Sequence, residues 1–277
     1  MEDQLTNSIR DFVSENNYNG ISDTEFQYFD EPLVKFATIN DPLFEKYKEI
    51  IGSFHLTPRE AFELEFGEKS FHSGTVISIV LPISEFIRKS NRVQTEFASR
   101  EWALLRSFGD ENFISKLVIF TIEQLKQQGF RALAPGKSKG FKISSTESGA
   151  TSNWSERHIA YVAGQGSFSL NDGFISEKGM AIRLISIVTD AVFSPNKRTV
   201  KLHNENCLFC KKGSCGACIR RCPAGAITKD GHDKKKCYAF TYSEEGRQRS
   251  VAWGGQYDFG SGCGLCQTKV PCEFRCP

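Results

Sequence analysis

The sequence predicts an α/β N-terminal domain of mixed α+β layers, followed by a cysteine-rich C-terminal domain. Two observations carry this prediction. Strand-like apolar runs alternate with helix-like segments through the first two hundred residues, which is typical of layered α and β structure. All ten cysteines lie at or after Cys207. The turn-rich stretch FSPNKR at 193–198 marks the change, so we expect domains at 1–200 and 201–277.

The helices of the first domain carry recognisable start and stop signals. Asp41 can cap a helix that begins at Pro42. Thr57 can cap the next helix with Glu60 as its capping-box partner, and Gly67 can end it. Residues 112–129 place apolar side chains on one face and end in a glycine, which predicts an amphipathic helix.

Three segments of the first domain have the composition of strands. Residues 74–82 form a nearly continuous apolar run rich in branched side chains, which is typical of a buried strand. Residues 179–190 show the same pattern, and 130–135 form a shorter one. We therefore expect a sheet flanked by helices.

Composition and charge limit the class of protein. The chain of 277 residues is 39% hydrophobic and 25% charged, which is typical of a globular protein. Its net charge of +2 does not by itself indicate a nucleic-acid partner. The polar N-terminus has no signal-peptide pattern, and no stretch is apolar enough for a membrane span. We expect a cytoplasmic protein with no membrane partner, where clustered cysteines indicate metal binding or catalysis rather than disulfides.

Three interpretations of the cysteines compete. Cys207-x2-Cys210 and Cys215-x2-Cys218 could supply four thiolates to zinc. The cysteines could also be inert buried thiols. The third interpretation is iron–sulfur, because Cys215-x2-Cys218-x3-Cys222-Pro resembles the end of the bacterial ferredoxin run. Zinc leaves six cysteines without a role, whereas two 4Fe-4S clusters need eight, so we favour a bacterial ferredoxin-like double 4Fe-4S domain.

The ferredoxin resemblance implies which cysteine serves which cluster, because that fold crosses its ligands. The implied ligands of the first cluster are Cys207, Cys215, Cys218 and Cys272. Those of the second cluster are Cys222, Cys237, Cys263 and Cys266. Cys210 and Cys276 are then spare. Lys212 stands where the usual run has a ligand, so either Cys207 or Cys210 could reach the first cluster, and Cys276 could replace Cys272.

The segment 211–236 is strongly basic, with eight Lys or Arg against two Asp. It could simply offset the negative charge of thiolate-bound clusters. It could instead dock an acidic electron donor such as a flavodoxin or ferredoxin, and a nucleic-acid patch is a third interpretation.

Residues 152–190 indicate which class of iron–sulfur protein the chain resembles. They contain Glu156-Arg157, the turn Ala163-Gly164-Gln165-Gly166, then Asn171, and an apolar strand that ends in Thr-Asp at 189–190. This order, together with the cysteine order that follows, resembles epoxyqueuosine reductases and reductive dehalogenases.

The resemblance implies a corrinoid (cobalamin) on the α/β domain, reduced through the two clusters. The cofactor-binding residues that it implies are Arg157, Gly164, Gly166, Ser169 and Asn171. The catalytic candidates, chosen because they are nearest in sequence to these residues, are His158, Tyr161 and Asp172.

Plainer interpretations of the same residues remain open. Asn153 could cap a helix that begins at Trp154, with Glu156 as its capping-box partner. His158 could be an ordinary surface or hydrogen-bonded histidine. Gly164 and Gly166 follow a helix rather than a strand, so they are no dinucleotide fingerprint and could simply end that helix.

Three departures from the epoxyqueuosine reductase pattern set further expectations. Ala150 stands where those enzymes carry a proton-donating Asp, and GQGSFSLND lacks the usual Trp and Lys. No helical-repeat domain follows the last cysteine, so we expect tRNA not to be the substrate. We expect an iron–sulfur oxidoreductase that reduces an unknown small molecule or nucleoside. The alternative is a ferredoxin-like electron carrier or reductive activator of a partner protein.

Overall fold

A computed structural model describes residues 1–21, 24–147 and 149–277. Its centre is a four-stranded antiparallel sheet in the order β1-β2-β8-β3. The strands of this sheet are β1 (Leu33–Thr38), β2 (Thr75–Pro82), β8 (Ile182–Thr189) and β3 (Ala132–Leu133). The long apolar runs 74–82 and 179–190 thus form the two central strands, as predicted. Every residue of β2 is buried, which explains its continuous apolar sequence.

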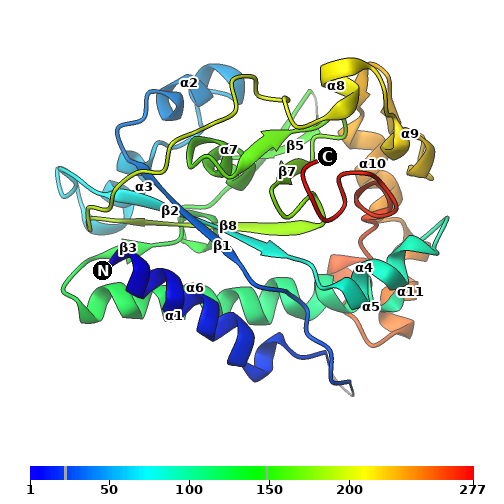
Figure 1. Cartoon of the computed structure of the whole chain (residues 1–277), viewed down its shortest axis with the longest axis horizontal. Coiled ribbons are helices and arrows are strands. Elements are labelled where there is room, and N and C mark those ends of the chain that lie inside the picture. Colours follow the sequence, from blue (N-terminus) through cyan, green and yellow to red (C-terminus); the bar gives the residue numbers. More distant parts are fainter. Residues whose placement is uncertain (22–23, 148) are drawn as a thin grey trace.

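Helices cover both faces of the sheet, so the predicted mixed α+β layers are confirmed (Figure 1). Those on one face are α1 (Glu2–Glu15) and α6 (Ile114–Gln127). Those on the other are α2 (Leu43–Ile50), α3 (Pro58–Phe66) and α7 (Glu156–Val162). Alternation along the strands separates two cores: Ile77 and Ile187 pack toward α1 and α6, whereas Val76 and Val188 pack toward α2, α3 and α7.

The predicted helix signals are confirmed with small shifts. Thr57 and Glu60 form the capping box of α3, and Gly67 ends that helix. At α2 the Asp41 carboxylate accepts from the backbone N–H of Leu43 at 3.0 Å, so the helix begins one residue later than expected.

The expected helix start at Trp154 is wrong. α7 begins at Glu156, after Ser155. Asn153 does not cap it, because its side chain accepts from the Lys142 backbone N–H at 2.8 Å and donates to the Gly140 carbonyl at 2.9 Å. Glu156 makes no capping-box bond with the helix start and is free to turn its carboxyl group elsewhere.

Short elements join the layers to the cysteine-rich region. The short helices of the first part are α4 (Glu85–Arg92), α5 (Arg100–Leu104), the π-helix η2 (Leu105–Phe113) and the 3₁₀ turns η1 (Asn17–Asn19) and η3 (Pro135–Lys137). Two hairpins follow, β4 (Ile143–Thr146) with β5 (Gly149–Ser152), and β6 (Gly166–Phe168) with β7 (Phe174–Ser176).

The cysteine-rich region lies at one end of the sheet (Figure 1). Its elements are α8 (Leu208–Lys212), α9 (Ala217–Arg221), β9 (Ile227–Thr228), β10 (Gly231–His232), α10 (Lys234–Thr241), α11 (Glu244–Ala252), η4 (Tyr257–Phe259) and η5 (Leu265–Gln267). Buried Glu273 ties it to α4 by accepting from Nε of Arg92 at 2.8 Å. The Met180 backbone N–H donates to the carbonyl of Cys272 at 2.7 Å, so the region packs directly against the start of β8.

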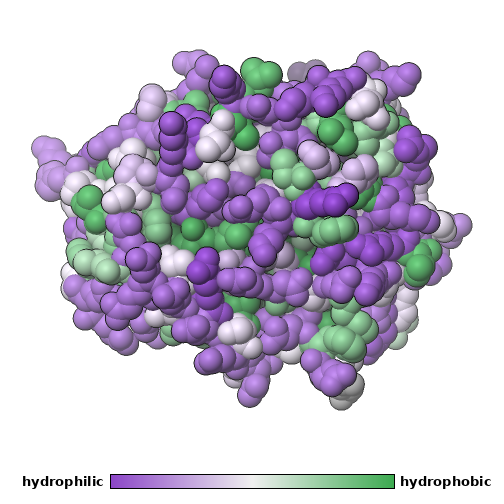
Figure 2. All heavy atoms as spheres, viewed as in Figure 1, coloured by the Kyte–Doolittle hydropathy of each residue, from purple (hydrophilic) through white to green (hydrophobic). Residues whose placement is uncertain are grey.

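The surface is mostly polar, with apolar side chains in small separate groups on the face that Figure 2 shows. None of the helices in the described ranges has the length and apolar character needed to cross a bilayer.

Candidate functional site

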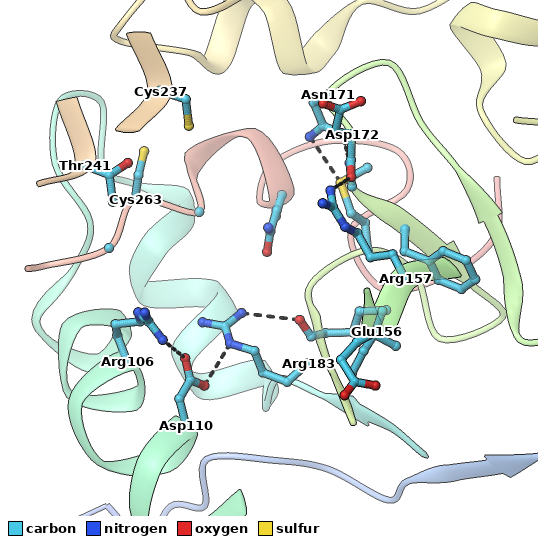
Figure 3. A pocket seen from close by; sticks show the side chains of 18 of the residues that line it. Arg106, Asp110, Glu156, Arg157, Asn171, Asp172, Arg183, Cys237, Thr241 and Cys263 are labelled. Atoms are coloured by element: carbon cyan, nitrogen blue, oxygen red, sulfur yellow. Dashed lines mark hydrogen bonds and ion pairs between the residues drawn. The ribbon is translucent and has the colours of Figure 1, made fainter. Parts of the chain in front are cut away.

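A large cavity of about 710 Å³ lies between the layered part and the cysteine-rich region. Cys222, Cys237, Cys263 and Cys266, the four cysteines assigned to the second cluster, all line it. Figure 3 shows Cys237 and Cys263 on one side of this space and Arg157, Asn171 and Asp172 on another. The cavity therefore faces both the cysteines and the segment that resembled a cofactor surface.

The four cysteines assigned to the first cluster line a separate, small cavity of about 20 Å³. They come together from α8, α9 and the C-terminal segment, and they are Cys207, Cys215, Cys218 and Cys272. Cys210 and Cys276, the two expected spares, are both exposed and line neither cavity. Eight of the ten cysteines thus line two cavities, four at each, and their role as cluster ligands stays a prediction.

Electrostatic interactions follow this division only in part, because the expected spare Cys210 also interacts with Cys207 and Cys218 of the first quartet. Burial is the main cause that raises the pKa of Cys272 to about 12, with smaller contributions from the first-quartet members Cys207 and Cys218. Burial likewise raises the pKa of Cys263 to about 11, with added interactions from Cys237 and Cys222. Such thiols stay protonated without metal, and binding iron would release their protons.

The two quartets adjoin one another. Burial raises the pKa of Cys266, and the interactions that add to it include Cys218 of the other quartet. Within residues 1–21, 24–147 and 149–277, no three His, Cys, Asp or Glu side chains converge closely enough to hold a single metal ion.

Glu156, which the sequence analysis named in a family motif and as a capping-box partner, lines the large cavity. Its Oε2 is shielded from solvent and has no hydrogen-bond partner among the described residues, although the residue as a whole keeps some accessible surface. Burial raises the pKa of Glu156 to about 8, against hydrogen bonds from Ser186 and Trp154 that lower it. The side chain is therefore a mostly neutral carboxylic acid at pH 7.

Arg157 and Asp172 line the same cavity and contact one another, because an Nη1 hydrogen of Arg157 donates to the backbone carbonyl of Asp172. The Asp172 carboxylate lies 3.3 Å from Nδ1 of His232 and 4.0 Å from Nζ of Lys234. Burial opposes ionisation of Asp172, but these cationic partners outweigh it and lower its pKa. Asp172 is therefore a carboxylate at neutral pH and a poor proton donor.

Asn171 lines the large cavity, and its Nδ2 donates to the Cys266 carbonyl at 3.3 Å. Ser169 donates its hydroxyl hydrogen to Oδ1 of Asn171 but lines the small cavity instead. Asn171 thus links the segment after the glycine turn to the second quartet.

The glycine turn makes close backbone contacts. Gly164 has a φ of +73°, and an added Cβ there would lie 3.1 Å from the Lys197 carbonyl oxygen. A Cβ on Gly166 would lie 2.0 Å from the carbonyl oxygen of Ile175, across the β6–β7 hairpin. Neither glycine is among the residues that line the large cavity, so their cofactor role stays a prediction.

His158 and Tyr161 also lie away from the large cavity. Nδ1 of His158 is 2.7 Å from the Ser155 hydroxyl, and burial lowers its pKa to about 3, so its imidazole is neutral. His158 lines a second cavity of about 480 Å³, which Arg157 and Ala150 also border. The Tyr161 ring lies under the guanidinium of Arg198, 5.4 Å from it. A catalytic role for either residue stays a prediction.

Comparison with known proteins agrees with this architecture. No family model matches the chain. A 127-residue segment, 44% of the chain, is 32% identical to an epoxyqueuosine reductase from Bacillus anthracis and covers 30% of that protein. Two solved epoxyqueuosine reductase structures, one from Bacillus subtilis and one with a tRNA stem loop, match 98% of the chain and 65% of their own. Their TM-scores are 0.51 and 0.53, at 18% and 17% identity.

The chain has the fold of epoxyqueuosine reductase. The expected resemblance is therefore confirmed, and the match spans less than two thirds of these relatives' length. A catabolic reductive dehalogenase aligns more weakly, with a TM-score of 0.47 over 71% of the chain and 25% of its own.

Sequence reasoning missed Arg106, Asp110 and Arg183, which line the large cavity with Glu156. One signal was available for Arg183, because it is a lone charge inside the apolar run of β8. Arg106 and Asp110 gave no such signal, because they reach the cavity through the π-helix η2.

Proposed function

We propose that the protein is an iron–sulfur reductase that holds its reducible substrate in the large cavity. One observation carries the proposal: the second cysteine quartet lines the same cavity as Glu156, whose Oε2 is shielded from solvent. An electron source and a proton source would then face one space, which is what reduction of a bound molecule requires.

The two quartets would each hold a 4Fe-4S cluster, Cys207, Cys215, Cys218 and Cys272 one, and Cys222, Cys237, Cys263 and Cys266 the other. The domain boundary near residue 200 belongs to the same proposal. The exposed basic residues 211–212 and 235–236 support docking of an acidic donor such as a flavodoxin or ferredoxin.

The large cavity suits a corrinoid or another sizeable group, since cofactor sites commonly have volumes of roughly 300–1,000 Å³. The polar groups that would hold it are Asn171, Arg157 and the unpartnered Oε2 of Glu156. When bound, the clusters supply single-electron transfer and a corrinoid supplies a reducing cobalt centre.

Glu156 is the proton donor that we propose. An acid with a pKa of about 8 is protonated at neutral pH and can release a proton to a developing anion. Asp172 is ionised and His158 is neutral, so neither offers a proton as readily. Glu156 would thus take the role of the Asp that Ala150 replaces.

We also propose that tRNA is not the substrate, although one epoxyqueuosine reductase with the same fold was solved with a tRNA stem loop. The residue that supports this proposal is Ala150, which lies at the position where an acid is expected.

The test is anaerobic titration of the cluster-loaded protein with cobalamin, followed by turnover with a strong reductant. We expect new sharp visible bands on titration and little epoxyqueuosine reduction in tRNA. Clusters without any spectral change would favour the electron-carrier alternative. Rapid epoxide reduction would contradict the substrate proposal.

A further inference from the structure

A charged triad lines one wall of the large cavity. Asp110 lies in η2 between two arginines, 3.1 Å from Nη1 of Arg106 and 2.8 Å from Nε of Arg183 (Figure 3). The Asp110 side chain is only 8% exposed. π-helices such as η2 are rare and occur frequently at functional sites.

The triad carries an excess positive charge, because one carboxylate serves two guanidinium groups. The other carboxyl groups of the cavity do not balance it. Glu111 pairs with Lys137 at 3.2 Å, and Asp172 pairs with His232 and Lys234. Glu156 is mostly protonated at neutral pH. A positive charge that these carboxyl groups leave unbalanced in a sheltered site is costly unless a partner of opposite charge, a bound anion or the thiolate-held cluster, lies near it.

Both arginines keep N–H groups free for such a partner. Arg183 uses Nε for Asp110 and Nη1 for the Ile182 carbonyl, and its Nη2 has no partner in the described part of the chain. Arg106 uses Nη1 for Asp110 and Nη2 for the Tyr242 hydroxyl, and its Nε has no partner within residues 1–21, 24–147 and 149–277. The guanidinium of Arg183 lies 5.6 Å from the Trp102 ring centre, so packing holds its orientation.

We propose that Arg106 and Arg183 form a binding site for an oxyanion, a carboxylate or phosphate group, inside the large cavity. The planar fork of a guanidinium group matches the two oxygens of such an anion. Apolar side chains of the same cavity, among them Ile114, Val118 and Phe240, would contact the body of the ligand. The site goes beyond the proposed function, because it specifies the charge of the molecule that enters.

The test uses full-length, cluster-loaded protein without corrinoid, titrated calorimetrically at pH 7 with phenylacetate and with its neutral amide. We expect the wild type to bind the acid about tenfold more tightly than the amide, as for a hydrogen bond to a charged group. Arg183→Gln and Arg106→Gln should each remove this preference. Asp110→Asn should strengthen the preference for the acid, because this substitution removes the carboxylate that competes for the two arginines.

Arg131→Gln is the matched control. Nε of Arg131 lies 2.9 Å from the Asp190 carboxylate, a similar pair that does not line the large cavity. This variant should keep the full preference, and the iron content of every variant shows whether it has folded. Equal binding of acid and amide by the wild type would overturn the proposal. The proposal would also be overturned if Arg183→Gln kept the preference for the acid and shifted the reduction potential of the cluster. The arginines would then balance the charge of the cluster.

A second arm identifies the source of the oxyanion and rests on the proposed function. Cobalamin carries a phosphodiester that cobinamide lacks. If Arg183→Gln weakens binding of cobalamin but not of cobinamide, the oxyanion belongs to the cofactor. If it weakens phenylacetate alone, the oxyanion belongs to a separate small ligand. If neither corrinoid binds, the proposed corrinoid is wrong while the first arm still tests the oxyanion site.

Discussion

Replacing Glu156 with glutamine tests whether the cavity holds a neutral acid. Burial raises the pKa of Glu156 from 4.5 to about 8, so the folded protein binds a proton that the unfolded chain releases between these values. The stability that this proton gives is present at low pH and is lost as the pH rises from 4.5 to 8. The free energy of unfolding should fall by about 1.4 kcal/mol per pH unit in this range, and the fall should level off near pH 8.

Between pH 6 and pH 8 the wild type should therefore lose about 2 kcal/mol of unfolding free energy that Glu156→Gln does not lose. Urea unfolding of the cluster-loaded protein at both pH values, followed by tryptophan fluorescence, measures this difference. Glu123→Gln, on the exposed face of α6, is the control and should follow the wild type. Equal pH dependence of the wild type and Glu156→Gln would refute the neutral acid.

Two further predictions concern the cysteine-rich region. Cys210→Ser and Cys276→Ser should each keep both clusters, whereas Cys218→Ser or Cys266→Ser should lose one, as iron analysis would show. Iron lost from Cys210→Ser but not from Cys207→Ser would reverse that assignment. Glu273→Ala should lower the free energy of unfolding by about 3 kcal/mol, because it leaves Arg92 unpaired. Its control is Glu85→Ala, at an exposed ion pair, which should lower the free energy of unfolding by under about 1 kcal/mol in the same urea experiment. Equal losses would show that the tie to α4 contributes little.

Local patterns in the sequence predicted the layers well. The apolar runs of β2 and β8 and the capping box of α3 are dictated by neighbouring residues, so they could be identified without the fold. The antiparallel order β1-β2-β8-β3 depends on contacts between distant segments, which no local pattern contains.

Part of the candidate site could likewise be predicted from the sequence, and part could not. The ferredoxin resemblance implied two sets of four cysteines, and in the structure the same residues line two cavities, while their role as cluster ligands stays a prediction. Glu156 was noticed as part of a motif, but its capping role was wrong, because the direction of a carboxyl group depends on tertiary packing. The triad of Arg106, Asp110 and Arg183 could not be predicted, because a π-helix and a strand far apart in sequence bring it together.

Metal analysis of anaerobically purified protein tests the central claim most directly, since electron delivery to the cavity depends on both clusters. Eight thiolates in two quartets predict about eight iron and eight sulfide per chain. They also predict a broad brown absorption that bleaches when the protein is reduced. Stoichiometric zinc with little iron would contradict the account.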